Sequence, residues 1–185
     1  FKKETYLLAR DRFGEKPLYY HWEDQIFSFS SELKSLLENK EIIRKINLDA
    51  LPYYFKTSLI PEPITFLKGV KSLEPGHFIR LEKGVLSTSR YFEYNYNPTN
   101  KIDNKKEAID YISPILENAV KRQTISDVPI GAFLSGGIDS SAVVSILQKN
   151  SSKKIKTFNV KFEDQAFDES SIAREVATHC GTEHH

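Results

Sequence analysis

Short stretches of alternating apolar and polar residues dominate the first thirty positions of the chain. An apolar residue at every second position is typical of strands that bury one face, so this pattern predicts an antiparallel system with strands at 5–9, 18–22 and 26–30. Leucines at helical spacing follow, and they predict a short helix over 31–39 that begins at a serine cap.

Prolines and glycines interrupt the middle of the chain. Pro52 lies in a stretch that predicts a short helix over 48–56, broken or started at that proline. The proline-rich segment 60–65 predicts an extended loop. Residues 77–94 predict a β-hairpin, because two stretches of alternating character flank a turn signal near Lys83.

A polar stretch at 95–107 is the best candidate for a linker. Beyond it, apolar residues recur every three or four positions from Lys105 to Gln123, which predicts a helix. Pro114 lies inside this pattern and predicts a kink or a restart of the helix, because proline lacks the N–H group that a helix interior uses.

The pattern after residue 128 is typical of a different architecture. Continuous apolar stretches predict buried strands at 129–134 and 154–162, and stretches of helical periodicity follow them at 140–149 and 168–181. The order strand, helix, strand, helix predicts a parallel sheet with right-handed crossovers. We therefore expect a mixed α/β fold class, in which an antiparallel β-rich part precedes the start of a parallel, helix-flanked sheet.

Composition narrows the classes of function. The 185 residues carry 26 basic and 25 acidic side chains, interleaved along the chain, so no basic tract predicts nucleic-acid binding. The longest apolar runs fall far short of the roughly 20 residues that span a bilayer, and the first residues lack the features of a signal peptide. The single cysteine, Cys180, fits a reducing, cytoplasmic location and is expected to be buried. Because the chain begins with Phe1 and contains no methionine, we expect a segment of a longer polypeptide.

The candidate chemistry lies in the loop between the first buried strand and its helix, with the sequence Ser-Gly-Gly-Ile-Asp-Ser-Ser. Ligands of open parallel sheets bind beyond the carboxyl ends of the strands, and a helix N-terminus offers unpaired N–H groups to an anion. Gly136 and Gly137 permit positive φ and a close approach of the backbone to a phosphate. The hydroxyls of Ser135, Ser140 and Ser141 add donors.

Asp139 changes the expected ligand of this loop. A carboxylate repels a bare phosphate, whereas Mg²⁺ bridges carboxylate and phosphate oxygens. The residues therefore predict a cradle for phosphate and magnesium. A glycine-rich turn capped by Asp139 is the alternative that the residues alone leave open. The spacing matches neither a Walker A loop nor a Rossmann fingerprint.

The same loop resembles the pyrophosphate-binding loop of the ATP pyrophosphatases. Alone, it leaves GMP, NAD and argininosuccinate synthetases and tRNA-modifying enzymes open. Residues 7–20 and 29–37 look like the end of the class II glutaminase domain of glutamine-hydrolysing asparagine synthetases. Residues 61–81 resemble the connecting region of that family, and residues 157–185 resemble the segment that follows the loop in its synthetase domain.

The resemblance implies three regions and one overall reaction. Residues 1–40 would be the end of a class II glutamine amidotransferase domain, 41–104 the connecting region, and 105–185 the N-terminal part of the ATP-pyrophosphatase domain. The family is an ATP-dependent ligase that adenylylates aspartate, releases pyrophosphate and amidates the intermediate with ammonia from glutamine. The implied substrates are therefore aspartate, glutamine and ATP, and a homodimer is a further expectation.

Site residues are implied in the same way, by position. The expected ATP-binding residues are Leu134, Ser135, Gly136, Gly137, Ile138, Asp139, Ser140, Ser141 and Val160. Of these, Asp139 would hold Mg²⁺. Leu134 and Val160 would meet the adenosine part from the ends of neighbouring strands.

The chain also departs from the family pattern. The family glutaminase uses an N-terminal cysteine as its nucleophile, whereas this chain begins with Phe1, so no glutaminase catalytic residue is identified and the nucleophile is expected upstream. Residues that bind the acid are expected beyond His185, so we expect the chain alone to be inactive. Two rivals stay open: another amide-forming ATP pyrophosphatase, such as a sugar or peptide amidotransferase or a β-lactam synthetase, and a non-catalytic nucleotide-binding module.

Other polar clusters have structural interpretations. The charged residues from Arg10 to Lys16 are expected to pair charges and shape a turn. The stretch 179–185 contains three histidines and a cysteine, but its spacing does not match a usual zinc site. Asp168 is interpreted as the cap of the last helix rather than as a ligand.

Overall fold

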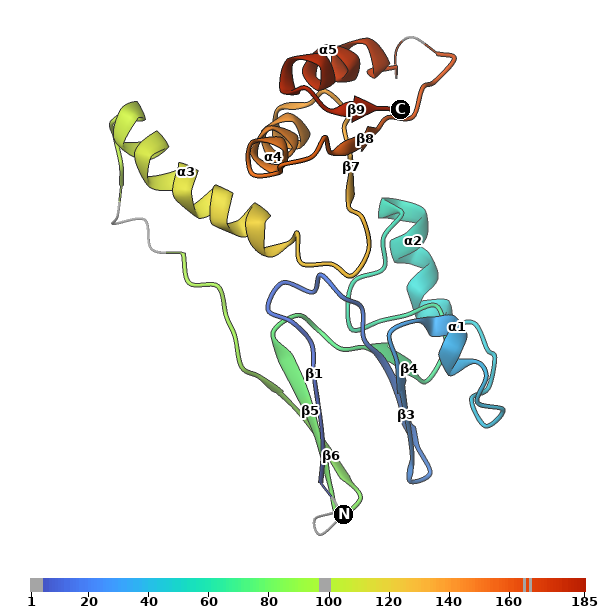
Figure 1. Ribbon diagram of the computed structural model, residues 1–185. Coiled ribbons are helices and arrows are strands. Elements are labelled where there is room, and N and C mark those ends of the chain that lie inside the picture. The colour runs from blue at the N-terminus through green and yellow to red at the C-terminus, as the bar shows by residue number, and fades with distance from the viewer. Residues whose placement is uncertain (1–4, 97–100, 165, 167) are drawn as a thin grey trace. The chain divides into compact units, whose positions relative to one another are not determined.

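The computed structural model describes residues 5–96, 101–164, 166 and 168–185. The chain divides into two compact units, Phe1–Asn97 and Pro98–His185, and each is described by itself (Figure 1). The division falls within the polar stretch that was predicted as a linker. The domain limits at 40 and 104 stay a prediction.

The first unit contains two antiparallel three-stranded sheets (Figure 1). In one sheet the order is β1 (Thr5–Ala9), β5 (His77–Glu82) and β6 (Val85–Arg90). In the other it is β3 (Ile26–Ser30), β2 (Tyr19–Glu23) and β4 (Val70–Ser72). The predicted strands and hairpin are confirmed, whereas β4 was not predicted. Strand β1 pairs with β5, and β2 pairs with β4. Each sheet therefore combines a strand from the predicted region 1–40 with a strand from the predicted region 41–104.

The helices of the first unit are short. Helix α1 (Leu33–Leu36) is about half as long as predicted, and the predicted serine cap is wrong: the N-cap residue is Glu32, without a side-chain cap. The physical reason is that Ser30 still belongs to strand β3, and its hydroxyl accepts instead from the N–H of Glu32 at 3.2 Å. A 3₁₀ turn (Leu48–Ala50) leads into α2 (Leu51–Thr57), which carries Pro52 in its first turn, as predicted.

The second unit holds a three-stranded parallel sheet in the order β7 (Gly131–Phe133), β8 (Lys156–Phe158) and β9 (Glu183–His184). Helices α4 (Ile138–Lys149) and α5 (Ser170–Cys180) form the crossovers. Their side chains build the core of the unit with the end of β7, through Leu134, Val144, Ala173 and Ala177. The predicted parallel sheet and the mixed α/β class are therefore confirmed.

Helix α3 (Lys105–Arg122) precedes this sheet and runs unbroken through Pro114, so the predicted restart is wrong. A proline inside a helix removes one backbone bond, and the helix continues because the bonds on either side remain. The side chain of Asn104 accepts from two backbone N–H groups and fixes the start. In the part of the chain that the structure describes, no helix is long and apolar enough to cross a membrane.

The ends of α5 meet the predictions in part. Gly181 follows the helix with φ of 73°, which confirms it as the stop. The N-cap residue is Glu169 rather than Asp168, so the predicted cap is displaced by one residue. The Asp168 carboxylate still accepts from the N–H and the hydroxyl of Ser170, and these bonds lower its pKa. Cys180 is half-buried and packs against the core of the unit.

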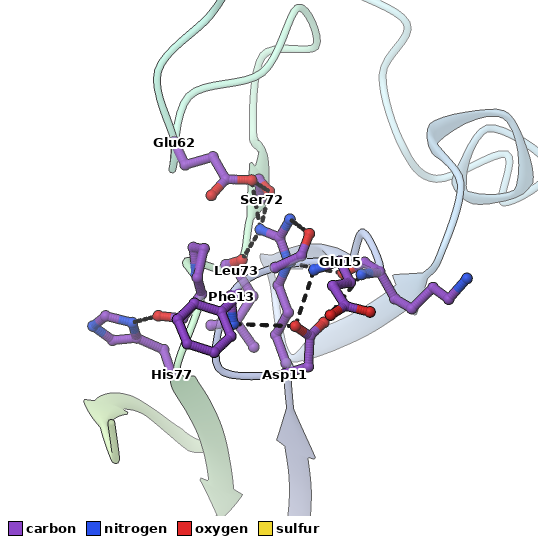
Figure 2. Close-up of polar contacts among 11 residues, drawn as sticks. Asp11, Phe13, Glu15, Glu62, Ser72, Leu73 and His77 are labelled. Atoms are coloured by element: carbon purple, nitrogen blue, oxygen red, sulfur yellow. Dashed lines mark hydrogen bonds and ion pairs between the residues drawn. The ribbon is translucent and has the colours of Figure 1, made fainter. Parts of the chain in front are cut away.

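The buried charge of the first unit is Arg10, whose side chain is 7% exposed. Its guanidinium pairs with the carboxylate of Glu62 (Figure 2). It also donates to three backbone carbonyls, those of Gly14 at 3.1 Å, Lys16 at 2.8 Å and Leu73 at 2.6 Å. A guanidinium supplies five N–H donors in a fixed plane, so one side chain holds the turn after β1 against two later segments. The structural interpretation of this stretch is confirmed for Arg10.

Asp11 shapes the same turn from its other side. Its carboxylate accepts from the backbone N–H groups of Phe13 at 3.2 Å, Glu15 at 2.9 Å and Lys16 at 3.0 Å (Figure 2). The bonds from Lys16 and Glu15 are the main causes that lower the pKa of Asp11 below its usual value of 3.8. The charged form of this carboxylate therefore stabilises the turn.

Replacing Arg10 tests the weight of this network. Arg10→Ala is expected to lower the free energy of unfolding by about 2–4 kcal/mol, because Glu62 and three carbonyls lose their donor. The exposed ion pair of Arg80 with Glu82 offers a matched control, and Arg80→Ala should cost less than about 1 kcal/mol. Urea denaturation of the protein measures both values. Equal losses of unfolding free energy in the two variants would show that the buried arginine stabilises the protein no more than the exposed one.

Asp11 predicts a pH dependence. Since folding lowers its pKa, its stabilising contribution is present above the usual carboxyl value of 3.8 and is lost as the pH falls through the lower folded value. Asp11→Asn should therefore flatten the fall of the thermal midpoint at acidic pH. Glu38→Gln removes an exposed carboxylate of the same unit and should leave the profile unchanged. A wild-type profile in Asp11→Asn would contradict the prediction.

Candidate functional site

The predicted loop begins at the paired carboxyl ends of β7 and β8. Phe133 and Phe158 are opposite each other in the parallel ladder, and the N–H of Leu134 donates to the carbonyl of Phe158 at 2.8 Å. The Leu134 side chain is buried in the core, whereas Val160 is 62% exposed. Leu134 and Val160 therefore follow neighbouring strands, as the sequence predicted.

The two glycines of the loop have different backbone conformations. Gly136 has a φ of +83°, the left-handed region that favours glycine. A Cβ atom built on it would be 2.8 Å from Cγ2 of Ile172 and 2.9 Å from the backbone nitrogen of Ala173. Gly137 has a φ of −67° and is the N-cap residue of α4. The prediction of positive φ is thus confirmed for Gly136 and wrong for Gly137, since an N-cap residue has an extended backbone that any residue adopts.

The serine hydroxyls form a small internal network. Ser135 Oγ and Ser140 Oγ are 3.0 Å apart, and the Gly137 N–H donates to Ser135 Oγ at 3.3 Å. The Ser140 hydroxyl donates to the Gly137 carbonyl at 3.1 Å. Ser141 is different, because its Oγ is buried and has no hydrogen-bond partner among the described residues. Two of the three predicted hydroxyls therefore shape the loop, and the third is buried.

The loop opens onto the N-terminus of α4. This helix begins at Ile138 and has no side-chain cap. Its first N–H groups have no carbonyl partner within the helix, so they and the helix dipole favour an anion. Ile138 is 89% exposed, and Asp139 is exposed in the first turn. Among the described residues, the Asp139 carboxylate makes no side-chain hydrogen bond or ion pair, and its exposure leaves it available to a ligand or a cation.

A cleft of about 310 Å³ lies beside this loop. Its lining residues are Phe133, Leu134, Ser135, Ser140, Phe158, Asn159, Val160, Phe162 and Glu169. Polar donors are at the loop, and aromatic and aliphatic side chains line most of the rest, together with Asn159 and Glu169. This division suits a ligand with a planar apolar part and an anionic part. Four of the predicted residues thus share one cleft, namely Leu134, Ser135, Ser140 and Val160.

Sequence reasoning missed the phenylalanines and Asn159. Part of the signal was available, because Phe133 and Phe162 lie at or next to the carboxyl ends of the predicted strands. Phe158 and Asn159 lie inside the predicted strand 154–162, and they come to the edge of the sheet because β8 already ends at Phe158. Asn159 has contacts to both neighbouring strands. Its side-chain amide donates to the Leu134 carbonyl at 2.9 Å, and its backbone N–H donates to the His185 carbonyl at 3.0 Å.

A larger cleft of about 870 Å³ lies along α5 and β9 and includes Lys161, Arg174 and His184. Burial lowers the pKa of His184, and the charges of Arg174 and His185 lower it further. This cleft contains none of the predicted ATP-binding residues. We place the candidate site at the smaller cleft, because the loop and the helix N-terminus are there.

Gly136 gives a direct test of the loop geometry. Gly136→Ala is expected to lower the free energy of unfolding by about 2 kcal/mol or more, because the new Cβ meets both left-handed strain and the backbone of α5. Gly181→Ala is the matched control: its φ is +73°, but a Cβ there meets nothing within 4 Å, so it should cost only about 1 kcal/mol. Thermal denaturation measures both, and a smaller loss at Gly136 than at Gly181 would contradict the packing argument.

Comparison with known protein families divides the chain in two. Residues 1–92 match the glutamine amidotransferase domain family, and residues 112–185 match the asparagine synthase family. The first match ends within the first compact unit, and the second lies within the second unit.

Two of three similar proteins have both activities in their names, and the third is named an amidase. The chain is 38% identical over its whole length to a putative glutamine-hydrolysing asparagine synthetase 2 of Methanocaldococcus jannaschii. It is 40% identical over 95% of its length to the glutamine-hydrolysing asparagine synthetase 1 of Bacillus subtilis. It is also 30% identical over 99% of its length to the amidase chyE of Penicillium rubens.

The chain spans about a third of the length of these relatives: 36% of the archaeal protein, 27% of the Bacillus protein and 29% of the fungal amidase. Both family matches run in the order that the sequence resemblance implied. The chain belongs to the family of glutamine-hydrolysing asparagine synthetases.

Proposed function

We propose that the protein containing this chain is an ATP-dependent ligase that makes asparagine from aspartate and glutamine-derived ammonia. The observation that carries the proposal is the Ser-Gly-Gly loop, with Gly136 pressed against α5 at the end of β7 and the uncapped α4 beyond it. Such a loop suits a pyrophosphate group. The names of the archaeal and Bacillus relatives support the product.

In this proposal the cleft beside the loop takes ATP. The phosphates lie at the first turn of α4, where the N–H groups donate to their oxygens. The hydroxyls of Ser135 and Ser140 donate as well once they turn away from their bonds within the loop. The adenosine part lies against Leu134 and Val160, at the ends of β7 and β8. Binding of ATP rather than another nucleotide rests on family membership.

Asp139 is the residue proposed to hold Mg²⁺. In the part of the chain that the structure describes, no three His, Cys, Asp or Glu side chains are grouped so as to hold a metal. One carboxylate beside a phosphate-binding loop suits Mg²⁺, which keeps several waters and takes its other ligands from phosphates. Bound there, the ion would offset the charge that repels Asp139 from the phosphates.

The proposed reaction has two steps. An oxygen of the aspartate side-chain carboxylate bonds to the α-phosphorus of ATP, and the bond from that phosphorus to the bridging oxygen breaks, which releases pyrophosphate. Ammonia then attacks the carbonyl carbon of β-aspartyl-AMP, loses a proton, and displaces AMP. The loop contributes to the first step by holding the pyrophosphate as its charge develops, a form of electrostatic stabilisation.

Glutamine is the proposed source of ammonia. The match of residues 1–92 to the amidotransferase family supports this. The single cysteine of the chain, Cys180, packs in the core of the second unit and donates to or accepts from Ser145 Oγ at 3.2 Å. Cys180 is therefore not proposed as the glutaminase nucleophile, and the pairing of two copies stays a prediction.

A second candidate function is amidation of a different acid. The fungal relative, an amidase by name, matches 99% of the chain at 30% identity. The same loop would serve it, because the loop meets the nucleotide rather than the acid. The two candidate functions differ in the acid that AMP formation requires.

The full-length protein gives the test. With Mg-ATP and ammonia, aspartate should be required for AMP and pyrophosphate formation. Asp139→Asn keeps the shape of the side chain but removes its charge, and should lower kcat/KM on the order of 100-fold. Asp127→Asn, an exposed carboxylate of the same unit, is the control and should keep wild-type activity.

Each other outcome has a definite meaning. AMP formation that ignores aspartate but requires another acid would replace the substrate and keep the mechanism. ADP as the product would overturn the adenylylation step, because the γ-phosphate and not pyrophosphate would then leave. No turnover with any acid would overturn the ligase proposal in favour of a nucleotide-binding module. Full activity of Asp139→Asn would remove Asp139 from the magnesium site.

A further inference from the structure

One residue joins the carboxyl ends of all three parallel strands. Asn159 directly follows β8. Its backbone N–H donates to the carbonyl of His185 after β9, at 3.0 Å, and its side-chain nitrogen donates to the carbonyl of Leu134 after β7, at 2.9 Å. Asn159 also lines both the cleft beside the loop and the larger cleft along α5.

The Leu134 carbonyl has a special position in the chain. The N–H of Leu134 makes the last ladder bond of β7, to Phe158, and Ser135 begins the loop. The peptide plane that carries the Leu134 carbonyl also carries the N–H of Ser135, which donates to Ser140 Oγ at 3.3 Å. A bond that orients this carbonyl therefore orients the first amide of the loop, because the peptide unit is planar.

The orientation of the Asn159 amide leaves an atom unsatisfied. Its Oδ1 is buried and has no hydrogen-bond partner among the described residues. Rotating the amide by half a turn would set that oxygen against the Leu134 carbonyl oxygen, so the nitrogen is held toward Leu134. A buried acceptor without a donor costs stability, and such costs are concentrated at functional sites. The unsatisfied Oδ1 is the cost of holding the nitrogen toward Leu134, and this cost supports a role for the bond to Leu134 beyond local packing.

We propose that Asn159 is a positioning residue for the nucleotide loop: through the Leu134 carbonyl it fixes the peptide plane from which Ser135 and its neighbours meet the phosphates. The inference rests on the proposed function. Asn159 does not touch the reacting atoms in this proposal, so its loss weakens nucleotide binding and leaves the chemical step largely intact.

Calorimetric titration of the full-length protein with Mg-ATP, without aspartate, tests this. Asn159→Ala should raise the Kd for ATP about tenfold, and Asn159→Asp should raise it further, because a second oxygen then faces the Leu134 carbonyl. At saturating ATP, kcat should change less than about threefold. If Asn159→Asp does not fold, Asn159→Ala carries the test alone.

Asn150 provides the matched control. Its amide also donates to a backbone carbonyl, that of Ile146 at 2.8 Å, but at the far end of α4. Asn150→Ala should lower the thermal midpoint without changing the Kd for ATP. A fall in thermal midpoint with an unchanged Kd in both Asn159 variants would overturn the positioning role.

The result separates this inference from the proposed function. A wild-type protein that binds Mg-ATP but forms no AMP with aspartate would overturn the proposed function, while the Kd comparison still decides the role of Asn159. A wild-type protein that binds no Mg-ATP would overturn both.

Discussion

Parallel pairing of β7 with β8 is the constraint on which the candidate site depends. It sets the carboxyl ends of the two strands side by side, with Phe133 opposite Phe158. The chain must then leave the sheet at Ser135 and enter α4 within three residues. The turn that does this contains a left-handed residue, Gly136. The short passage brings the serine hydroxyls next to the start of α4, which has no side-chain cap.

The first unit is held together differently, because its sheets are antiparallel and joined by irregular segments that Arg10 connects. Arg10 is buried there and satisfied by one carboxylate and three carbonyls. Breaking such a pair on one side leaves an uncompensated polar group, so the arrangement is specific as well as stabilising. The hydroxyl of Tyr91 adds a bond to the Arg10 carbonyl at 2.6 Å, from the end of the hairpin formed by β5 and β6.

Much of the fold follows from local pattern, and the errors have physical reasons. Alternation placed β1 and β3 to the residue, and the turn signal at Lys83 placed the hairpin. Strand β4 was missed, because three residues bounded by loops carry too little periodicity. Helix α3 was expected to kink or restart at Pro114, and it does not restart, since a local rule cannot weigh the intact bonds on either side.

The candidate site was predictable in composition but not in its contacts. The loop motif indicated a phosphate cradle, and the strand order placed Leu134 and Val160 on neighbouring strands. Three features needed coordinates: the close contact of Gly136 with α5, the burial of the Ser141 hydroxyl, and the bond of Asn159 across two strands. Each depends on residues that are more than fifteen positions apart or on the direction of a side chain.

The contact of Gly136 with Ala173 has a mechanical consequence. The space between the loop and the first turn of α5 is too small for a single methyl group. A shift of that turn toward the loop would therefore press on the backbone at Gly136. A ligand or a chain segment that tilts α5 would change the geometry of the loop without touching it, and the loop would transmit its own displacement to α5 in return.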